Sequence, residues 1–463
     1  MSPWKPHPFL TPCLAVLVLL SAGCAGGPGS PLPPPPRALG SQYQAFFPSR
    51  GRARAGESRQ TPVRAPRGAV TLPGALALAL MGNPRLQAFS WEVRAAEARR
   101  IQAGLLPNPE VSLEIEEFGG SGERAAFHGA QTTLTLSQLI QLGGKRSKRE
   151  KVAALRRDLA GWDYEGERLN VYAETARAFY DLLGAQERLA VAEESLRVAE
   201  NMAALSARRV RAGKASPLEE TKAALQLAVS KVALEGARRD LDLARKRLSA
   251  AWGEAEPGFE RAEGDFRSLL PELPSLENLR ARLAANPDLA RWKGEMDLRK
   301  AALDLAEAGR WPDLTLGGGV QRYEGTDDQA FVLQLSLPLM VFDRNQGRIM
   351  EAESRLSKAV AERKAALLRA GAALASAYRS LKAAHASALR FEREILPSAG
   401  KAFQAARAGY EGGKFDYLQV LDAQRTLLRV RLEYTGVLSS YHRALVEIER
   451  LTAAPITPKR KLK

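Results

Sequence analysis

Residues 145–211 read KRSKREKVAALRRDLAGWDYEGERLNVYAETARAFYDLLGAQERLAVAEESLRVAENMAALSARRVR, without a proline, between Gly143-Gly144 and Gly213. At helical rise, one helix over this stretch would be about 100 Å long, several times the diameter of a small domain. Its apolar side chains recur every three or four residues, as in a coiled-coil seam. They are Val152, Leu155, Leu159, Trp162, Leu169, Tyr172, Ala176, Phe179 and Leu183. The stretch therefore predicts a long helix that packs along a partner.

The partner follows directly in the sequence. Residues 217–252 carry leucines at sevenfold spacing, namely Leu227, Leu234, Leu241 and Leu248. Because glycine reverses a chain easily, we expect the two helices to turn back at Gly213 and to share one seam. On helix length alone, a coiled-coil scaffold protein is the alternative.

The composition is that of a folded, basic protein. Of the 463 residues, 45% are hydrophobic and 26% are charged, and the formal net charge is +16. We do not expect a nucleic-acid partner, because the arginines lie among glutamates on helix faces, without the interleaved aromatic side chains on which bases stack.

Residues 1–24 are interpreted as a signal peptide of the lipoprotein type. Lys5 supplies a positive start, residues 14–20 an apolar core, and Ser21-Ala22-Gly23 the small residues before Cys24. The apolar run is too short to span a bilayer as a mature helix. This stretch resembles a bacterial lipoprotein signal, which implies lipid attachment at Cys24. Ordinary signal-peptidase cleavage, with an incidental Cys24, is the alternative.

Two segments carry no periodicity. Residues 25–70 are rich in proline and arginine and include the run PGSPLPPPP, so we predict a tether between a membrane-attached terminus and the folded part. Residues 454–463 form a basic tail.

The remaining chain is an internal duplication, with a first repeat at 71–260 and a second at 261–453. Each repeat reads helix, strand, strand, long helix, turn, helix. The paired segments are Asn83-Pro84 and Asn286-Pro287, LPNPEVSLEIE (106–116) and RWPDLTLGGGV (310–320), LTLSQLIQLGGKR (134–146) and LQLSLPLMVFDRN (333–345), and RVRAGKASPLEETKAAL (209–225) and YEGGKFDYLQVLDAQRTL (410–427).

The shorter helices raise a question of length. They are expected at 71–106, 217–252, 286–309 and 415–451. Two of these helices reach the length of a long helix only when they are stacked end to end. This predicts a hollow cylinder of helices that continues from the strands.

Four segments alternate strictly between apolar and polar residues, at 110–116, 131–137, 314–321 and 331–337. We expect strands of about 9 to 11 residues, which is the length of a tilted transmembrane β-strand with apolar side chains outward. Soluble hairpins with one wet face are the alternative. Four strands are too few to close a barrel, and free edges are not tolerated in a bilayer, so the barrel is expected to be shared among two or more copies.

Over about 71–453, this order of motifs resembles the TolC family of outer-membrane efflux proteins. PNPE (107–110) with LSQLIQLGGKR (136–146) is similar to the outer-membrane components of cobalt-zinc-cadmium type efflux systems. The resemblance implies a mainly α protein with transmembrane β-structure: a homotrimer with a 12-stranded β-barrel, four strands per chain, continued by a long periplasmic α-helical barrel.

The resemblance also implies a location and partners. The chain would lie in the outer membrane, lipid-anchored, and would extend into the periplasm. There it would meet a periplasmic adaptor (membrane fusion) protein and an inner-membrane resistance-nodulation-division (RND) pump. The duct would passively export heavy-metal cations. The alternative is a duct for multiple drugs or for type I secretion.

The two helix turns are the candidate site. Gly213 and Gly413 can supply the left-handed conformation of a sharp reversal, and Lys214 and Lys414 follow at equivalent points. Ser216 is expected to cap the next helix, with Glu219 at capping-box spacing. By resemblance, adaptor docking falls on Arg211, Gly213, Lys214, Ser216, Gly412, Gly413 and Lys414.

The resemblance also places an entrance gate at Asp422, which matches a family aspartate that narrows the closed tunnel. The family's second entrance aspartate is Gln419 here. Three like charges around an axis would attract cations. A surface aspartate in the first turn of a helix is the alternative.

The sequence offers no catalytic constellation, so we expect no enzyme activity, no cofactor and no bound metal. His128, His385 and His442 stand without a second ligand at metal-binding spacing. Gly317-Gly318-Gly319 lies inside a predicted strand and is interpreted as a barrel kink.

Overall fold

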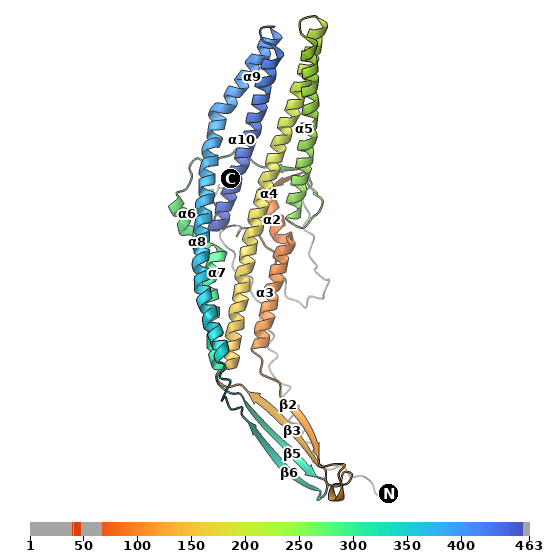
Figure 1. Ribbon diagram of the computed structural model, residues 1–463, viewed down its shortest axis with the longest axis vertical. Coiled ribbons are helices and arrows are strands. Elements are labelled where there is room, and N and C mark those ends of the chain that lie inside the picture. The colour runs from red at the N-terminus through yellow and green to blue at the C-terminus, as the bar shows by residue number, and fades with distance from the viewer. Residues whose placement is uncertain (1–38, 40, 48–66, 457–463) are drawn as a thin grey trace. The chain divides into compact units, whose positions relative to one another are not determined.

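The computed structural model describes residues 39, 41–47 and 67–456. The predicted signal peptide with Cys24, most of the predicted tether and residues 457–463 of the predicted tail lie outside them. In the described part, a four-stranded sheet lies at one end of the long helices and two helix turns lie at the other (Figure 1). No helix of this part is both long enough and apolar enough to cross a membrane.

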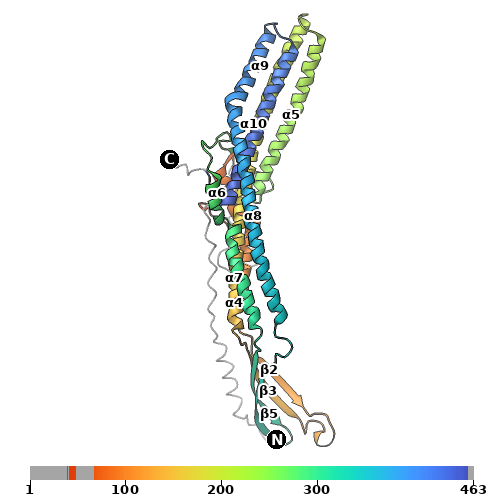
Figure 2. The same ribbon diagram turned by 60° about the vertical axis from the view of Figure 1, so that its left-hand side comes forward.

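The predicted central helix is present as α4, Lys145–Arg211, without interruption. It turns back into α5, Pro217–Ala250, in which Leu234 and Leu248 of the sevenfold set are buried. The second repeat follows the same plan (Figure 2). Its helices are α7 (Pro287–Ala308), α8 (Gln346–Arg390), α9 (Leu396–Glu411) and α10 (Tyr417–Thr452).

The long helical run of the second repeat continues through a proline. A π-helical turn, η4 (Phe391–Ile395), joins α8 to α9, and Pro397 follows in the first turn of α9. The N–H of Leu396 donates to the carbonyl of Phe391, five residues back. The π-turn thus accommodates a residue that cannot continue the ordinary helical ladder.

The single helix predicted over 71–106 is wrong, because it is broken at Asn83. Helix α2 spans Leu72–Gly82 and α3 spans Pro84–Ala103. Pro84 suits the first position of a helix but not its interior. Asn83 caps α3, since its Oδ1 accepts hydrogen bonds from the next two free N–H groups, at 2.9 and 3.2 Å.

The same asparagine confirms the end-to-end stacking. Asn83 Nδ2 donates to the carbonyl of Ala251, at the end of α5, at 2.8 Å. Asn286 does the same in the second repeat, where its Nδ2 lies 3.1 Å from the carbonyl oxygens of both Arg450 and Leu451, at the end of α10. Each Asn-Pro pair is therefore a joint. The asparagine amide links the end of α5 to the start of α3, and in the second repeat the end of α10 to the start of α7.

The strands form one antiparallel sheet in the order β2-β3-β5-β6. Their bounds are β2 (Glu110–Glu116), β3 (Gln131–Ile140), β5 (Leu314–Tyr323) and β6 (Asp328–Ser336). The sheet register aligns apolar residues across all four strands, as in the row Leu113, Leu134, Val320, Phe331. This face is exposed: Phe331 is 93% and Leu333 81% accessible. The predicted alternation is confirmed, although β2 is two residues shorter than the lower predicted length.

The helices keep the order of the strands. Next to the sheet, α3, α4, α7 and α8 are neighbours in that order, and beyond the joints the order is α5, α4, α10 and α9. The largest apolar core lies where the two levels meet, around Phe179, Leu182, Leu248, Trp252 and Phe259.

Some structure was not predicted from the sequence. The connector between the repeats contains β4 (Arg261–Glu263), which pairs in parallel with β1 (Ala69–Thr71), followed by α6 (Leu276–Arg282) and η3 (Leu283–Ala285). Within the predicted tether, Phe46 donates its N–H to the carbonyl of Leu80, and its own carbonyl accepts from the Tyr164 hydroxyl, at 2.9 and 2.7 Å. Residues 41–47 of the predicted tether therefore pack against the folded part, which was not predicted from the sequence.

The glycines of β5 keep the ladder intact rather than interrupt it. Gly317, Gly318 and Gly319 are paired in register on both sides. A Cβ on Gly319 would lie 2.2 Å from the carbonyl oxygen of Leu134, whereas the nearest atom to a Cβ on Gly318 is 4.0 Å away. Close approach of β3 therefore requires glycine at 319.

We expect Gly319→Ala to destabilise the protein by about 1–3 kcal/mol, because the added methyl meets backbone that cannot give way. Gly318→Ala, one residue away with open space, is the matched control and should stay within about 0.5 kcal/mol of wild type. Thermal unfolding in detergent measures both. Equal unfolding temperatures for the two variants would contradict the close approach.

Candidate functional site

The two turns have the same backbone geometry. Gly213 and Gly413 are left-handed, with φ of 67° and 73°. The N–H groups of Lys214 and Lys414 reach back five residues to a helix carbonyl, at 2.8 and 2.7 Å. This is the Schellman arrangement, which satisfies carbonyls left free at a helix end. Both predicted reversals are confirmed as defined turns.

The helices after the turns are capped by side chains. Ser216 Oγ accepts from the N–H of Leu218 at 3.3 Å, and Asp416 Oδ1 accepts from the N–H of Gln419 at 3.1 Å. The N-cap at Ser216 is confirmed. The predicted reciprocal role of Glu219 is wrong, because its carboxylate accepts instead from the Tyr410 hydroxyl, at 3.3 Å, across the gap between the two helix pairs.

The surface at the turns is open. The residues predicted for adaptor docking are all exposed; they are Arg211, Gly213, Lys214, Ser216, Gly412, Gly413 and Lys414. Three apolar side chains, Leu218, Phe415 and Leu418, are exposed beside them. The turns therefore present basic and apolar groups together at one end of the helices.

Arg209 and Tyr410 connect the two helix pairs near the turns, a contact that sequence reasoning missed. The Arg209 guanidinium lies 4.3 Å from the centre of the Tyr410 ring and also donates a hydrogen bond to the Tyr410 carbonyl. A guanidinium over an aromatic face is attracted by the ring electrons. The available signal was a difference between the repeats, because Tyr410 stands where the first repeat has Val210. We call Arg209, Tyr410 and Glu219 the inter-pair contact.

The two predicted gate residues lie on one face of α10. Gln419 and Asp422 are three residues apart and both exposed, on the side of the helix away from the buried Val420. Arg425 follows on the same side and binds Gln226 Oε1 of α5 at 3.2 Å. The single chain leaves the Asp422 carboxylate facing solvent.

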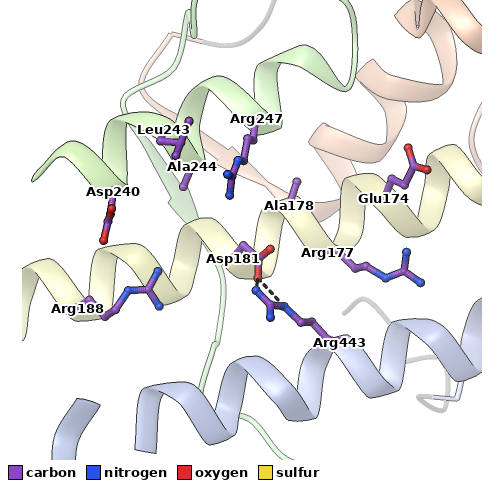
Figure 3. Close-up of a pocket in the computed structure, with 10 residues that line it drawn as sticks. All are labelled: Glu174, Arg177, Ala178, Asp181, Arg188, Asp240, Leu243, Ala244, Arg247 and Arg443. Carbon is purple, nitrogen blue, oxygen red and sulfur yellow. Dashed lines mark hydrogen bonds and ion pairs between the residues drawn. The ribbon is translucent and has the colours of Figure 1, made fainter. Parts of the chain in front are cut away.

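A second polar site lies midway along the helices, between α4, α5 and α10 (Figure 3). It is a groove of about 300 Å³, and its charged lining residues are Glu174, Arg177, Asp181, Arg188, Asp240, Arg247 and Arg443. Asp181 Oδ1 accepts two hydrogen bonds from Arg443, at 3.0 and 2.8 Å. Four of the charged residues come from one face of α4, opposite the face that packs against the connector.

Two histidines hold the connector rather than a metal. His442 Nε2 lies 2.8 Å from the Phe266 carbonyl, and His385 Nε2 lies 2.8 Å from the Leu270 carbonyl. The His442 ring is stacked on Tyr180, with centroids 4.0 Å apart, and burial lowers its pKa, which favours the neutral imidazole. In the described residues, no group of three or more His, Cys, Asp or Glu side chains is arranged to hold a metal ion.

Comparison with known proteins places this architecture. The family described as outer membrane efflux protein matches residues 75–254 and 278–454. The cobalt-zinc-cadmium resistance protein CzcC of Cupriavidus metallidurans is 37% identical over 384 residues, which cover 83% of this chain and 90% of CzcC. The nickel and cobalt resistance protein CnrC of the same organism is 30% identical, over 66% of this chain and 72% of CnrC.

Solved structures agree on the fold. CusC, which forms a transmembrane channel, is similar with a TM-score of 0.71 and 18% identity, over 93% of this chain and all of the solved CusC chain. A membrane protein from Pseudomonas aeruginosa has a TM-score of 0.71 and 22% identity, over 85% of this chain and 92% of its own. From the matched family, which covers both repeats, it follows that the chain belongs to the outer membrane efflux proteins.

Proposed function

We propose that the chain is the outer-membrane duct of a tripartite efflux system and that it carries heavy-metal cations. The observation that supports this cargo is the similarity to CzcC over most of both chains. The proposed role is passive: the protein forms a conduit, without enzymatic activity, and the driving force comes from an RND pump reached through a periplasmic adaptor.

The free edges of the sheet support a homotrimer. Strands β2 and β6 are the outermost strands, so each presents one unpaired row of backbone groups. In a bilayer these groups must find partners, and β6 of one chain beside β2 of the next supplies them. Three copies give twelve strands, an even number within the observed range for barrels.

The helices provide edges that match. Between the sheet and the joints, α3 exposes Trp91 and Ile101 on one side, and α8 exposes Met350 and Val360 on the other. Exposed apolar rows on opposite edges of one chain fit a head-to-tail contact, which closes into a ring when the rotation per copy allows it. The helical part would then form a tube below the barrel.

The charged groove is proposed to line this tube. The opposite face of α4 is covered by the connector and by residues 41–47. Three copies of these segments would fill the tube if they pointed inward, so we place them outside. The face with Arg177, Asp181 and Arg188 then borders the lumen, where charged side chains keep a water-filled path.

The turn end is proposed as the adaptor-docking and entrance end. It lies opposite the membrane sheet, and its residues Arg211, Lys214, Ser216, Gly412 and Lys414 are exposed on defined turns. Asp422 and Gln419 follow within three turns of α10. Around a threefold axis, Asp422 would form a single acidic ring.

We expect deletion of the gene to sensitise cells to zinc, cobalt and cadmium, because export across the outer membrane would be lost. Growth is measured against a series of metal concentrations, with hydrophobic drugs as a parallel series and the intact gene on a plasmid as the control. Sensitivity to drugs alone would contradict the metal cargo and favour a multidrug duct. A purified protein that is a water-soluble monomer without detergent would contradict the duct and favour a periplasmic scaffold.

We expect the mature chain to begin at a lipid-bearing Cys24. Mass spectrometry of the N-terminal peptide should show the added acyl mass in wild type, and Cys24→Ala should lack it because the thiol that carries the lipid is gone. The Cys13→Ala variant, changed within the predicted signal peptide, is the control and should keep the lipid. A mature N-terminus at another residue would refute the anchor.

We expect Asp422→Asn to weaken cation selectivity, because it removes one negative charge per chain from the proposed entrance while preserving side-chain size. Reversal potentials across a salt gradient in a planar bilayer measure the effect, which should be a shift toward zero. Asp416→Asn, which keeps a capping oxygen at the start of the same helix, is the control and should leave selectivity unchanged. Equal potentials for Asp422→Asn and wild type would remove Asp422 from the gate.

A further inference from the structure

The last described residues turn back onto the end of α10. Ala453 is left-handed, with φ of 50°, and the N–H of Ile456 donates to Glu449 Oε1 at 3.0 Å. The side chain of Ile456 packs on an apolar cluster formed by α6, α8 and α10. Residues 453–456, which we call the C-terminal return, therefore lie against Glu449, which is only 8% exposed.

The first described residue joins the return at the same place. The N–H of Leu39 donates to the carbonyl of Ala453 at 3.0 Å, and the carbonyl of Leu39 accepts from Arg168 of α4 at 3.4 Å. Arg168 in turn pairs with Glu165 at 2.8 Å, and both of these side chains are buried. Leu39, Leu169 and Ala453 form a small apolar cluster. The two ends of the described chain are thus tied to each other and to α4.

Glu449 is a buried acid without a cationic partner. The titratable groups that face it are phenols, namely Tyr172 and Tyr180 of α4 and Tyr441 of α10, with Tyr43 of the N-terminal segment beside Tyr172. Burial raises the pKa of Tyr172 and Tyr180, and the nearby Glu449 adds to the rise, so their hydroxyls stay neutral where a carboxyl titrates. Among the described residues, no lysine, arginine or histidine compensates a charge on Glu449.

The protonation of Glu449 therefore depends on whether the return covers it. Burial raises the pKa of its carboxyl to about 7, although the N–H of Ile456 opposes the rise. In water the carboxyl would titrate near its ordinary value of 4.5. The closed return thus binds the proton more tightly than the open one, so closing is favoured at low pH. This preference weakens about tenfold for each pH unit above 4.5 and is lost as the pH rises through about 7.

The first repeat has the same reversal without a titratable group. With the turn glycines aligned, Glu449 corresponds to Ser249 and Ala453 to Gly253. Gly253 is also left-handed, with φ of 90°, and the N–H of Glu254 donates to the backbone carbonyl of Ser249 at 3.2 Å. Ser249 is fully buried and cannot ionise. Only the second joint has a proton-dependent acceptor at this position.

We propose that Glu449 and the C-terminal return form a pH-sensitive clasp, which holds both ends of the described chain against α4 while the carboxyl is protonated and releases them when it ionises. Release lets water reach the carboxylate, whereas a closed return would leave a charge buried without a partner. The clasp does not rest on the proposed function, because it involves only contacts within one chain.

Amide hydrogen exchange of the full chain in detergent tests the clasp. We expect the protection factors of the peptides that contain Ile456 and Leu39 to fall together, by up to tenfold per pH unit between pH 5 and pH 7, and to level off above pH 7. The peptide with Ser249 and Glu254, at the first joint, is the internal control and should stay constant. Unchanged protection at Ile456, or an equal fall at the first joint, would overturn the clasp.

Two glutamine variants identify the group that titrates. Glu449→Gln keeps an acceptor oxygen for the return but cannot ionise, so its protection at pH 8 should match that of wild type at pH 5. Glu447→Gln is the matched control, since Glu447 pairs with Arg177 and Arg450, and it should keep the wild-type profile. Burial lowers the pKa of His442, which therefore acts with the opposite sign and equally in both variants. A wild-type profile in Glu449→Gln would overturn the proposal.

Shortened chains test whether the return causes the effect. In the full chain, Glu449→Gln should raise the thermal unfolding temperature at pH 8 and leave it unchanged at pH 5, because only the ionised carboxyl is costly to bury. In a chain that ends at Ala453 the carboxyl is uncovered, so the substitution should have no effect at either pH. A chain that ends at Pro458 keeps the return and should respond like the full chain. An equal rise at pH 8 in the chain that ends at Ala453 would overturn the clasp.

Discussion

The unpaired edges of the four-stranded sheet are the constraint on which the rest of the structure depends. A sheet whose apolar face is exposed over all four strands suits an apolar medium, and there its edge groups on β2 and β6 require partners. The helices have open edges as well, since they stand side by side in the order of the strands and leave one uncovered edge on each side. One assembly that pairs the strand edges also covers the helix edges.

The Asn-Pro joints solve a second problem, which is how two short helices stacked end to end can match the length of one long helix. A free helix end leaves four unsatisfied groups, and two facing ends would leave eight. The side-chain oxygens of Asn83 and Asn286 accept from N–H groups of the helix that follows each. Their side-chain nitrogens donate to carbonyl oxygens at the end of the helix stacked on it, which is α5 for Asn83 and α10 for Asn286. Proline at the next position needs no partner for its nitrogen. Two residues therefore make each stacked pair continuous.

The sequence predicted the parts of the fold that have a period and missed those that depend on single contacts. Apolar residues every three or four positions predicted α4, and strict alternation predicted the strands and their exposed face. The connector strand β4 is three residues long, too short for a period to register. The docking of residues 41–47 depends on the backbone hydrogen bond from Phe46 to Leu80 and on the packing of Phe47 against Tyr164, contacts between distant parts of the chain that leave no local pattern. At the site, glycine predicted both turns, but the inter-pair contact joins residues about 200 positions apart and leaves no local pattern.

Duplication gives the two repeats one scaffold, so the differences between them carry information that the shared features cannot. When Gly213 is aligned with Gly413, Asp422 corresponds to Lys222 and Tyr410 corresponds to Val210. At this position an acidic ring can therefore come only from the second repeat, and the inter-pair contact is centred on Tyr410, also a residue of the second repeat. The π-turn and Pro397 fall in this repeat as well. The first repeat supplies a continuous rod, whereas the second carries the Asp422 carboxylate, Tyr410 of the inter-pair contact and the π-turn.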